Sequence, residues 1–308
     1  MILSICPNPS IDCTIELDSL NVGMLNKIDN KVETYSGKAL NVAIGVARLN
    51  KKSVATGFMF NNHKILFENA LKKDGVEFDF VDCEGSARVN YKIIDKKSML
   101  TEINDKGEMV ERSKQLDLIE KVKKLSVDAE IVVLSGSLPK GTEDLFYGEI
   151  VSVIPKDKKI ILDGEKNCVM SAISNHDIFM VKPNIYELEN FSGRTVRTKK
   201  DMILSAKSYI ELGVKYVLIS MGADGAILTD GKESYFCKSA NVAVNSTVGA
   251  GDSMVSAAAV AITENLSNEE VLKRAVSAGT AAVTTSGTNL FYKEKYDEIY
   301  NEIFVEKI

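Results

Sequence analysis

The sequence predicts an α/β protein built on a mostly parallel central sheet, and three observations carry this prediction. Short apolar runs of strand length alternate with helical segments along most of the 308-residue chain. The runs are apolar throughout, which is typical of strands buried on both faces. Each run ends in a polar or glycine turn. We therefore expect helices on both faces of the sheet and a ligand site at the carboxyl ends of its strands.

The expected elements follow one another along the chain. An apolar run at residues 2–6 forms a first strand, and residues 38–50 carry apolar side chains at helical spacing. A strand at 53–60 then leads into a helix at 63–75 that ends in a glycine. Further buried strands are expected at residues 129–137, 158–164, 176–184 and 215–225. Helical segments separate these strands, as parallel pairing requires.

Two segments depart from this order. Residues 10–35 and 87–112 alternate apolar with polar side chains, which indicates half-exposed antiparallel strands. Together they could form a small sheet beside the main one. No internal repeat or linker divides the chain, so we expect a single domain over residues 1–308.

Composition excludes several classes of protein. The net charge is −5, which argues against a nucleic-acid-binding protein, and an acidic protein that handles phosphates needs a locally positive pocket. The five cysteines are scattered without a CxxC pair, so neither a zinc site nor a disulfide framework is indicated. No apolar run is long enough to span a bilayer, and the first residues do not resemble a signal peptide. We expect a cytoplasmic protein that binds no membrane.

The stretch NSTVGAGDSMVSAAAVA, residues 245–261, places two glycines and a carboxylate before a small-residue apolar run. Gly249 and Gly251 allow close backbone approach, and the free N–H groups of the following helix form an anion site. Asp252 could there accept the proton of a hydroxyl that attacks a phosphoryl group. A glycine-rich helix start with an acidic first turn explains the pattern equally well.

Two further stretches admit both a structural and a functional interpretation. Asn184 and Glu187 in KPNIYELEN suit a helix N-cap, or a magnesium site built from oxygen ligands. LISMGADGAI is a hairpin, or a turn that places Ser220, Gly222 and Gly225 beside a nucleotide.

Basic residues occur in two places. Lys38 in YSGKALNVA begins a helix, where a cation is unfavourable unless an anion lies nearby, although the stretch is not a Walker A loop. Arg88, Asn90 and Lys92 in ARVNYK share one face of a strand. This face is either solvated, or it contributes with Lys38 to a clamp on a substrate phosphate.

These motifs together resemble the ribokinase-like carbohydrate kinases, the PfkB family. NSTVGAGDSMVSAAA resembles the family's C-terminal signature, SGKALNVA its GGKG-x-N-x-A motif, and KPNIYELE its N-x-x-E element. CPNPSID, ARVNYKI, TEIN and SGSLPKG are most similar to the phosphosugar branch, the 1-phosphofructokinases and tagatose-6-phosphate kinases. The resemblance spans nearly the whole chain. Ser36 and Ala39 depart from it, since both replace glycines of the usual motif.

The resemblance implies a three-layer α/β/α domain with a small β-sheet lid formed by residues 10–35 and 87–112. It implies MgATP as the phosphoryl donor and a sugar hydroxyl as the acceptor. Asp252 matches the catalytic base, and Gly249, Ala250 and Gly251 match the anion hole. The family's positions that contact the nucleotide correspond to Lys182, Asn184, Glu187, Ser220, Gly222 and Gly225. Of these, Asn184 and Glu187 correspond to the positions at the magnesium ion. The family's positions that contact the phosphosugar correspond to Asp12, Gly37, Lys38, Asn41, Arg88 and Asn90.

The expected reaction converts fructose 1-phosphate to fructose 1,6-bisphosphate. The sequence leaves two alternatives open: a tagatose-6-phosphate kinase, and a non-catalytic sugar-phosphate sensor on the same fold. The apolar face of the small sheet needs a cover, and the same face of a second subunit would supply one. We therefore expect a homodimer formed through this sheet.

Overall fold

The computed structural model describes residues 1–97, 99–285 and 289–308, and within them it shows a large sheet between two layers of helices. The large sheet has eleven strands in this part of the chain, in the order β15-β14-β13-β12-β11-β10-β9-β1-β4-β5, with β6 also paired to β4. Their bounds are β1 Ile2–Cys6, β4 Ser53–Phe60, β5 Glu77–Phe78, β6 Val81–Cys83, β9 Ile131–Ser135, β10 Lys159–Asp163, β11 Met180–Val181, β12 Tyr216–Ser220, β13 Ala226–Thr229, β14 Ser234–Cys237 and β15 Val305–Lys307.

Parallel pairing dominates this sheet. Strand β1 lies between β4 and β9 and runs parallel to both, and β9 to β12 continue in parallel. The last three strands, β13 to β15, pair antiparallel at one edge. The prediction of a mostly parallel α/β sheet is therefore confirmed, and the glycine turn after β12 forms the tight hairpin that the sequence allowed.

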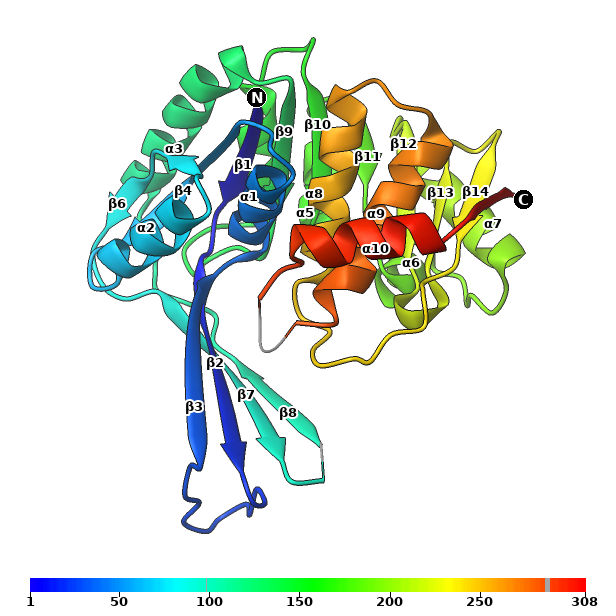
Figure 1. Cartoon of the computed structure of the whole chain (residues 1–308). Coiled ribbons are helices and arrows are strands. Elements are labelled where there is room, and N and C mark those ends of the chain that lie inside the picture. Colours follow the sequence, from blue (N-terminus) through cyan, green and yellow to red (C-terminus); the bar gives the residue numbers. More distant parts are fainter. Residues whose placement is uncertain (98, 286–288) are drawn as a thin grey trace.

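Helices cover both faces of this sheet. Helices α1, α8 and α9 pack along one face with α10 against α9, and the contacting series α3 to α7 covers the other (Figure 1). The bounds are α1 Lys38–Arg48, α2 Lys64–Lys73, α3 Arg112–Leu125, α4 Phe146–Ser152, α5 Lys166–Ile173, α6 Ile185–Ser192, α7 Lys199–Ile210, α8 Ala250–Thr263, α9 Asn268–Ala282 and α10 Lys293–Glu302. None of the helices in the described residues could cross a membrane.

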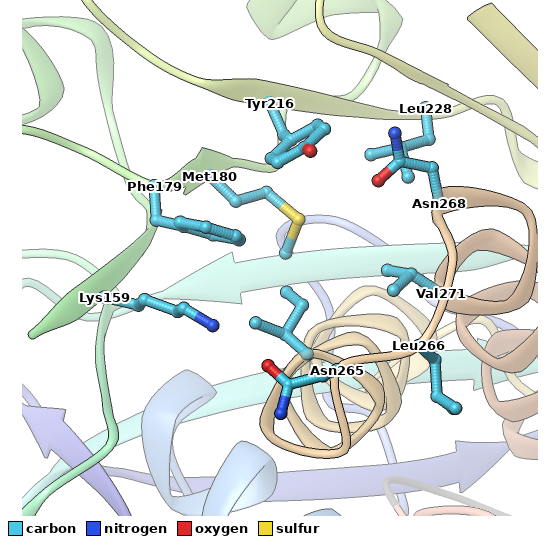
Figure 2. Close-up of a pocket in the computed structure, with 10 residues that line it drawn as sticks. Lys159, Phe179, Met180, Tyr216, Leu228, Asn265, Leu266, Asn268 and Val271 are labelled. Carbon is cyan, nitrogen blue, oxygen red and sulfur yellow. The ribbon is translucent and has the colours of Figure 1, made fainter.

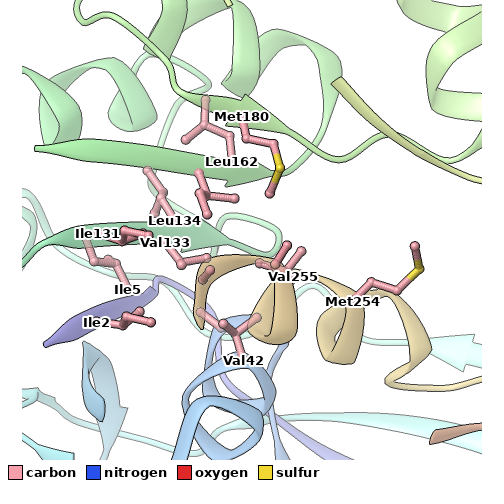
Figure 3. Packing of buried hydrophobic residues seen from close by; sticks show 14 of the residues in the cluster. Ile2, Ile5, Val42, Ile131, Val133, Leu134, Leu162, Met180, Met254 and Val255 are labelled. Carbon is pink, nitrogen blue, oxygen red and sulfur yellow. The ribbon is translucent and has the colours of Figure 1, made fainter. Parts of the chain in front are cut away.

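The core fixes the relative position of the two helices that carry the glycine motifs. Val42 of α1 and Val255 of α8 pack with the apolar strand residues, Ile5 and Leu134 among them (Figure 3). The helices approach closely at Gly45, where an added Cβ would lie 2.3 Å from Ser256 Oγ. Close packing at this point fixes the first turns of α1 and α8 relative to each other.

The second sheet projects from the large one (Figure 1). Its four strands in the described residues, β2 Ser10–Leu17, β3 Asn30–Ser36, β7 Arg88–Asp95 and β8 Leu100–Asn104, take the order β3-β2-β7-β8. The hairpins β2–β3 and β7–β8 are antiparallel, as expected. The expectation of antiparallel strands is wrong at the centre, where β2 and β7 run parallel. The chain between them crosses the main domain, so the two segments do not meet as a hairpin.

A small pocket of about 190 Å³ lies at the amino ends of β10 to β12, against the turn between α8 and α9. Phe179, Met180 and Tyr216 face Asn265 and Val271 across it (Figure 2). None of the residues that the sequence predicted for the site lines this pocket.

Candidate active site

A polar cleft of about 640 Å³ opens between the carboxyl ends of the parallel strands and one face of the small sheet. Each of four adjacent strands β9 to β12 brings side chains or backbone to it at or just after its last residue. The small sheet contributes alternate residues of β2, β7 and β8, which share a face because side chains alternate along a strand. The cleft therefore lies where a parallel sheet binds its ligands.

An apolar cavity of about 650 Å³ adjoins this cleft. The two share Asn184, Ser220 and Gly251 in their walls. The remaining wall includes the segment around residues 238–247 and one side of α9, with Val276 and Thr280 one turn apart. An elongated molecule with an apolar end and a charged end fits this combination.

Every site residue that the sequence predicted lines one of these two cavities. The polar cleft holds Asp12, Gly37, Lys38, Asn41, Arg88, Asn90, Lys182, Asn184, Glu187, Ser220, Gly249, Gly251 and Asp252. The apolar cavity holds Asn184, Ser220, Gly222, Gly225, Ala250 and Gly251.

The start of α8 lies at the junction of the two cavities. Gly249 is the N-cap and has φ 78°, a conformation that favours glycine. An added Cβ on Gly251 would lie 3.2 Å from Lys182 Nζ, so a side chain here would crowd the lysine. The free N–H groups of the first turn and the adjacent ammonium group make this helix start suitable for an anion.

Asp252 is buried in this first turn. Its Oδ2 accepts a hydrogen bond of 2.8 Å from Asn41 Nδ2 of α1. Burial raises the pKa of Asp252 to about 6, with Asp163 adding to the rise, while Lys38, Asn41 and Lys182 oppose it. A buried carboxylate with a pKa near neutrality suits general base catalysis.

A second buried carboxylate, Asp163 at the end of β10, lies between two lysines. Its Oδ1 is 3.2 Å from Lys38 Nζ and 3.6 Å from Lys182 Nζ. Burial acts to raise the pKa of Asp163, but the two lysines outweigh it and hold the pKa below its ordinary value. Asp163 thus fixes both ammonium groups near the start of α8. We predicted no role for Asp163 from the sequence, although a carboxylate at the end of an apolar strand indicates a ligand site.

Lys38 and Arg88 line the same cleft but have different neighbours. Asp163 is the main cause of a raised pKa of Lys38, with further contributions from Asp252 and Glu187. Burial lowers the pKa of Arg88, and its Nη1 donates to the carbonyl oxygen of Asp105 at 3.3 Å. Arg88 Nε is buried without a hydrogen-bond partner among the described residues, while the side chain as a whole lines the cleft.

Asp12 is held by three side chains of the small sheet. Oδ1 accepts from Asn90 Nδ2 at 3.1 Å and from Ser10 Oγ at 3.4 Å, and Oδ2 is 3.1 Å from Lys92 Nζ. Because Lys92 neutralises it, the Asp12 carboxylate can face a sugar hydroxyl without repelling a nearby phosphate.

The cleft is not positive by count. Among its lining residues four are basic, namely Lys38, Arg88, Lys92 and Lys182, and six are acidic, namely Asp12, Glu102, Asp163, Glu165, Glu187 and Asp252. The expectation of a locally positive pocket therefore fails on this count. Lysines pair with Asp12 and with Asp163, so these two carboxylates leave no unpaired negative charge in the cleft.

Asn184 and Glu187 form a capping box on α6. Asn184 Oδ1 accepts from the Glu187 N–H and Glu187 Oε2 accepts from the Asn184 N–H, both at 2.8 Å. The structural interpretation of this pair is thus confirmed, and the pair also lines the cleft. The described residues contain no group of three or more His, Cys, Asp or Glu side chains arranged for a metal.

The fold is that of a sugar kinase, as comparison with known proteins shows. The model of the pfkB family carbohydrate kinases matches residues 7–295, so the chain belongs to this family. It is similar to a 1-phosphofructokinase of Borreliella burgdorferi, with 33% identity over 100% of this chain and 99% of the relative. It is also similar to a tagatose-6-phosphate kinase of Staphylococcus epidermidis, with 28% identity over the full length of both. Phosphofructokinase-2 from Escherichia coli, solved in complex with substrates and products, superposes with a TM-score of 0.91 at 27% identity over 98% of both chains.

Proposed function

We propose that this protein transfers the terminal phosphoryl group of ATP to the carbon-6 hydroxyl of fructose 1-phosphate. The observation that carries the proposal is Asp252, a buried carboxylate with a pKa of about 6, at a helix start between a polar cleft and an apolar cavity. Relatives named 1-phosphofructokinase at 31% and 33% identity over nearly their whole length support it.

The cavities suggest how the substrates are arranged. The adenosine of ATP would occupy the apolar cavity, with its phosphates directed to the start of α8. Backbone N–H groups at Gly249, Ala250 and Gly251 would then face the transferred group, and Lys38 and Lys182 would offset its charge. Asp252 would accept the proton of the attacking hydroxyl. Ser220, Gly222 and Gly225 would contact the nucleotide.

The phosphosugar would extend toward the small sheet. Asp12, Asn41 and Asn90 offer carboxylate and amide groups to its hydroxyls, with Gly37 giving room beside them. Arg88 would bind the phosphate that the sugar already carries, because it is a cationic side chain that lines the cleft on the small sheet. We propose that the small sheet acts as a lid on this end of a single kinase domain.

The donor set fits magnesium only in part. Glu187 and Asn184 are oxygen donors beside the cleft, but they are too few to enclose the ion, so the nucleotide phosphates and water would supply the other ligands. Magnesium bound there would neutralise phosphate charge.

The second candidate is a tagatose-6-phosphate kinase, favoured by the relative of that name that matches the chain end to end. Both sugars carry one phosphate and one primary hydroxyl at opposite ends, so the same cleft accommodates either. A non-catalytic sensor is disfavoured, because binding alone does not require a carboxylate with a raised pKa at the anion site.

An assay of ADP release across fructose 1-phosphate, tagatose 6-phosphate, fructose 6-phosphate and the free sugars tests the proposal. We expect the highest kcat/KM with fructose 1-phosphate. A preference for tagatose 6-phosphate would select the second candidate, and sugar binding without ADP release would select the sensor.

We also propose a homodimer that forms through the face of the small sheet opposite the cleft. This face carries Ile11, Ile15, Val89 and Tyr91 and has a hollow of about 470 Å³.

A cytoplasmic location fits the five cysteines, which are all unpaired and buried.

A further inference from the structure

The side chain of Ser36 lies in a buried hydrogen-bond series that ends at Asp252. Ser36 Oγ donates to Asn41 Oδ1 at 3.1 Å, and Asn41 Nδ2 donates to Asp252 Oδ2 at 2.8 Å. Ser36 is 1% exposed and Asn41 is 6% exposed. Solvent therefore has little access to replace either bond.

The two bonds determine which way the Asn41 amide faces. An ionised carboxylate can only accept, so the amide nitrogen must face Asp252 and the amide oxygen must face Ser36. This oxygen accepts its hydrogen bond from the Ser36 hydroxyl. Without it a buried carbonyl oxygen loses its partner, and the amide is less firmly held against Asp252.

The place of Ser36 in the fold brings its hydroxyl beside Asn41. Ser36 is the last residue of β3, and Gly37 joins it directly to α1, whose first turn contains Asn41. The motif that the chain resembles has glycine at residue 36, which has no hydroxyl to donate. The serine thus adds a donor at a point where the small sheet joins the helix that carries Asn41.

We propose that Ser36 is a positioning residue, whose hydroxyl holds the Asn41 amide in the orientation that hydrogen-bonds and orients the Asp252 carboxylate. The inference rests on the proposed role of Asp252 as the general base. Other groups that act on Asp252 are Lys38 of α1, Asp163 of β10 and Lys182, which follows β11. None of these is changed when the Ser36 hydroxyl is removed.

The pH profile of kcat/KM separates this role from a merely structural one. The hydrogen bond from Asn41 lowers the pKa of Asp252, so a loosened amide lets that pKa rise. A base is active when deprotonated, and a higher pKa moves the acid limb of the profile to higher pH. We expect Ser36→Ala to move this limb upward by about 0.5–1 in pH, with little change in the KM for ATP.

A double-mutant cycle tests whether Ser36 acts through Asn41. Asn41→Ala should move the acid limb at least as far as Ser36→Ala, and the double variant should move it no farther than Asn41→Ala. Ser36→Gly, which also lacks the hydroxyl and adds no bulk, should shift the limb in the same direction. Ser53→Ala is the matched control, because Ser53 donates a buried hydrogen bond to the Ala43 carbonyl of α1 away from the cleft. It should leave the limb in place.

An unchanged acid limb in both Ser36 variants would overturn the inference. So would a shift of the acid limb by Ser36→Ala that is equally large in the wild-type protein and in the Asn41→Ala variant. A failure of the proposed function differs from either result. In that case the wild-type protein would release no ADP with any phosphosugar, or its acid limb would persist in Asp252→Asn.

Discussion

At the scale of single residues, the buried carboxylate of Asp252 is electrostatically unfavourable, and we propose that it acts as the general base. Its carboxylate is buried beside a second carboxylate, Asp163, which disfavours its charge, while two lysines and an amide favour it. The balance leaves the pKa at about 6, so the group is mostly ionised at neutral pH yet remains a moderately strong base. The same balance affects both turnover and stability.

We expect Asp252→Asn to lower kcat by about 10²–10⁴-fold, because an amide cannot accept the proton of the attacking hydroxyl. ATP binding, measured by calorimetry, should stay within a few-fold of wild type, since the variant keeps the shape of the site. Asp82→Asn alters an exposed carboxylate on β6 and serves as the control. A kcat within a few-fold of wild type in Asp252→Asn would remove Asp252 from the mechanism.

The buried charge also predicts how stability changes with pH. The pKa of Asp252 is about 6 in the folded protein against an ordinary value of 3.8, so the folded state binds the proton more tightly. The stability contributed by that proton is fully present below pH 3.8 and is lost as the pH rises through about 6. We expect Asp252→Asn, which mimics the protonated form, to raise the free energy of unfolding at pH 7.5 by about 1–3 kcal/mol.

Urea unfolding at pH 7.5 and near pH 4 measures this effect. The gain should nearly vanish at the lower pH, where the wild-type carboxyl is itself protonated. An equal gain at both values would mean that the substitution acts through packing, not through the charge.

At the scale of the element, the side chains of strand β7 line different cavities on the two faces of the small sheet. Arg88, Asn90 and Lys92 face the cleft, whereas Val89 and Tyr91 face the hollow on the other side. The parallel pairing of β7 with β2 places Asn90 directly across from Asp12. One strand would thus contribute both to the proposed binding of the sugar and to the proposed subunit contact.

Arg88→Ala tests whether the face of β7 toward the cleft binds the phosphate of the sugar. If Arg88 binds the existing phosphate, its loss should lower kcat/KM for the phosphosugar by about 10- to 100-fold or more. The KM for ATP should barely change, because the donor lies at the other end of the substrate. Weak activity on free fructose should also be little affected.

The matched control is Arg112→Ala on α3, an exposed arginine paired with Glu149. It should leave both sugars unaffected. Equal losses on the two sugars in Arg88→Ala would show that Arg88 supports the small sheet and does not bind phosphate.

At the scale of the whole molecule, the small sheet is the part least enclosed by the rest of the chain. It extends away from the large sheet (Figure 1), and its face opposite the cleft is mainly apolar. Large apolar side chains on and beside it remain exposed, among them Ile28, Tyr91 and Ile103. Apolar surface of this kind favours association.

We expect sedimentation at micromolar concentration to give about twice the chain mass of 33.7 kDa. Tyr91→Asp should shift the protein toward the monomer, because the side chain is 40% exposed on this face and a carboxylate there would be desolvated in the contact. Tyr186→Asp on α6, at a residue 75% exposed, is the matched control and should stay dimeric. A wild-type protein that sediments only as a monomer contradicts the proposal.

The sequence by itself determined the order of the main strands and helices, and it predicted many of the residues that line the two cavities, though not Asp163. Buried strands such as residues 131–135 and 159–163 have continuous apolar centres, and their type depends on near neighbours alone. Site residues such as Lys182 and Ser220 lie at or just beyond the ends of such runs, and every parallel strand delivers its end to the same edge. Both signals are local, so a single sequence retains them.

Tertiary structure alone decided which of these residues touch. Asn41 and Asp252 are 211 residues apart and meet because α1 and α8 pack closely at Gly45. Asp163 pairs with Lys38 as well as Lys182, and β2 runs parallel to β7, only once the strands are ordered in their sheets. The apolar cavity combines Val276 of α9 with a distant loop. These contacts depend on how whole elements pack, and no periodicity along the chain encodes them.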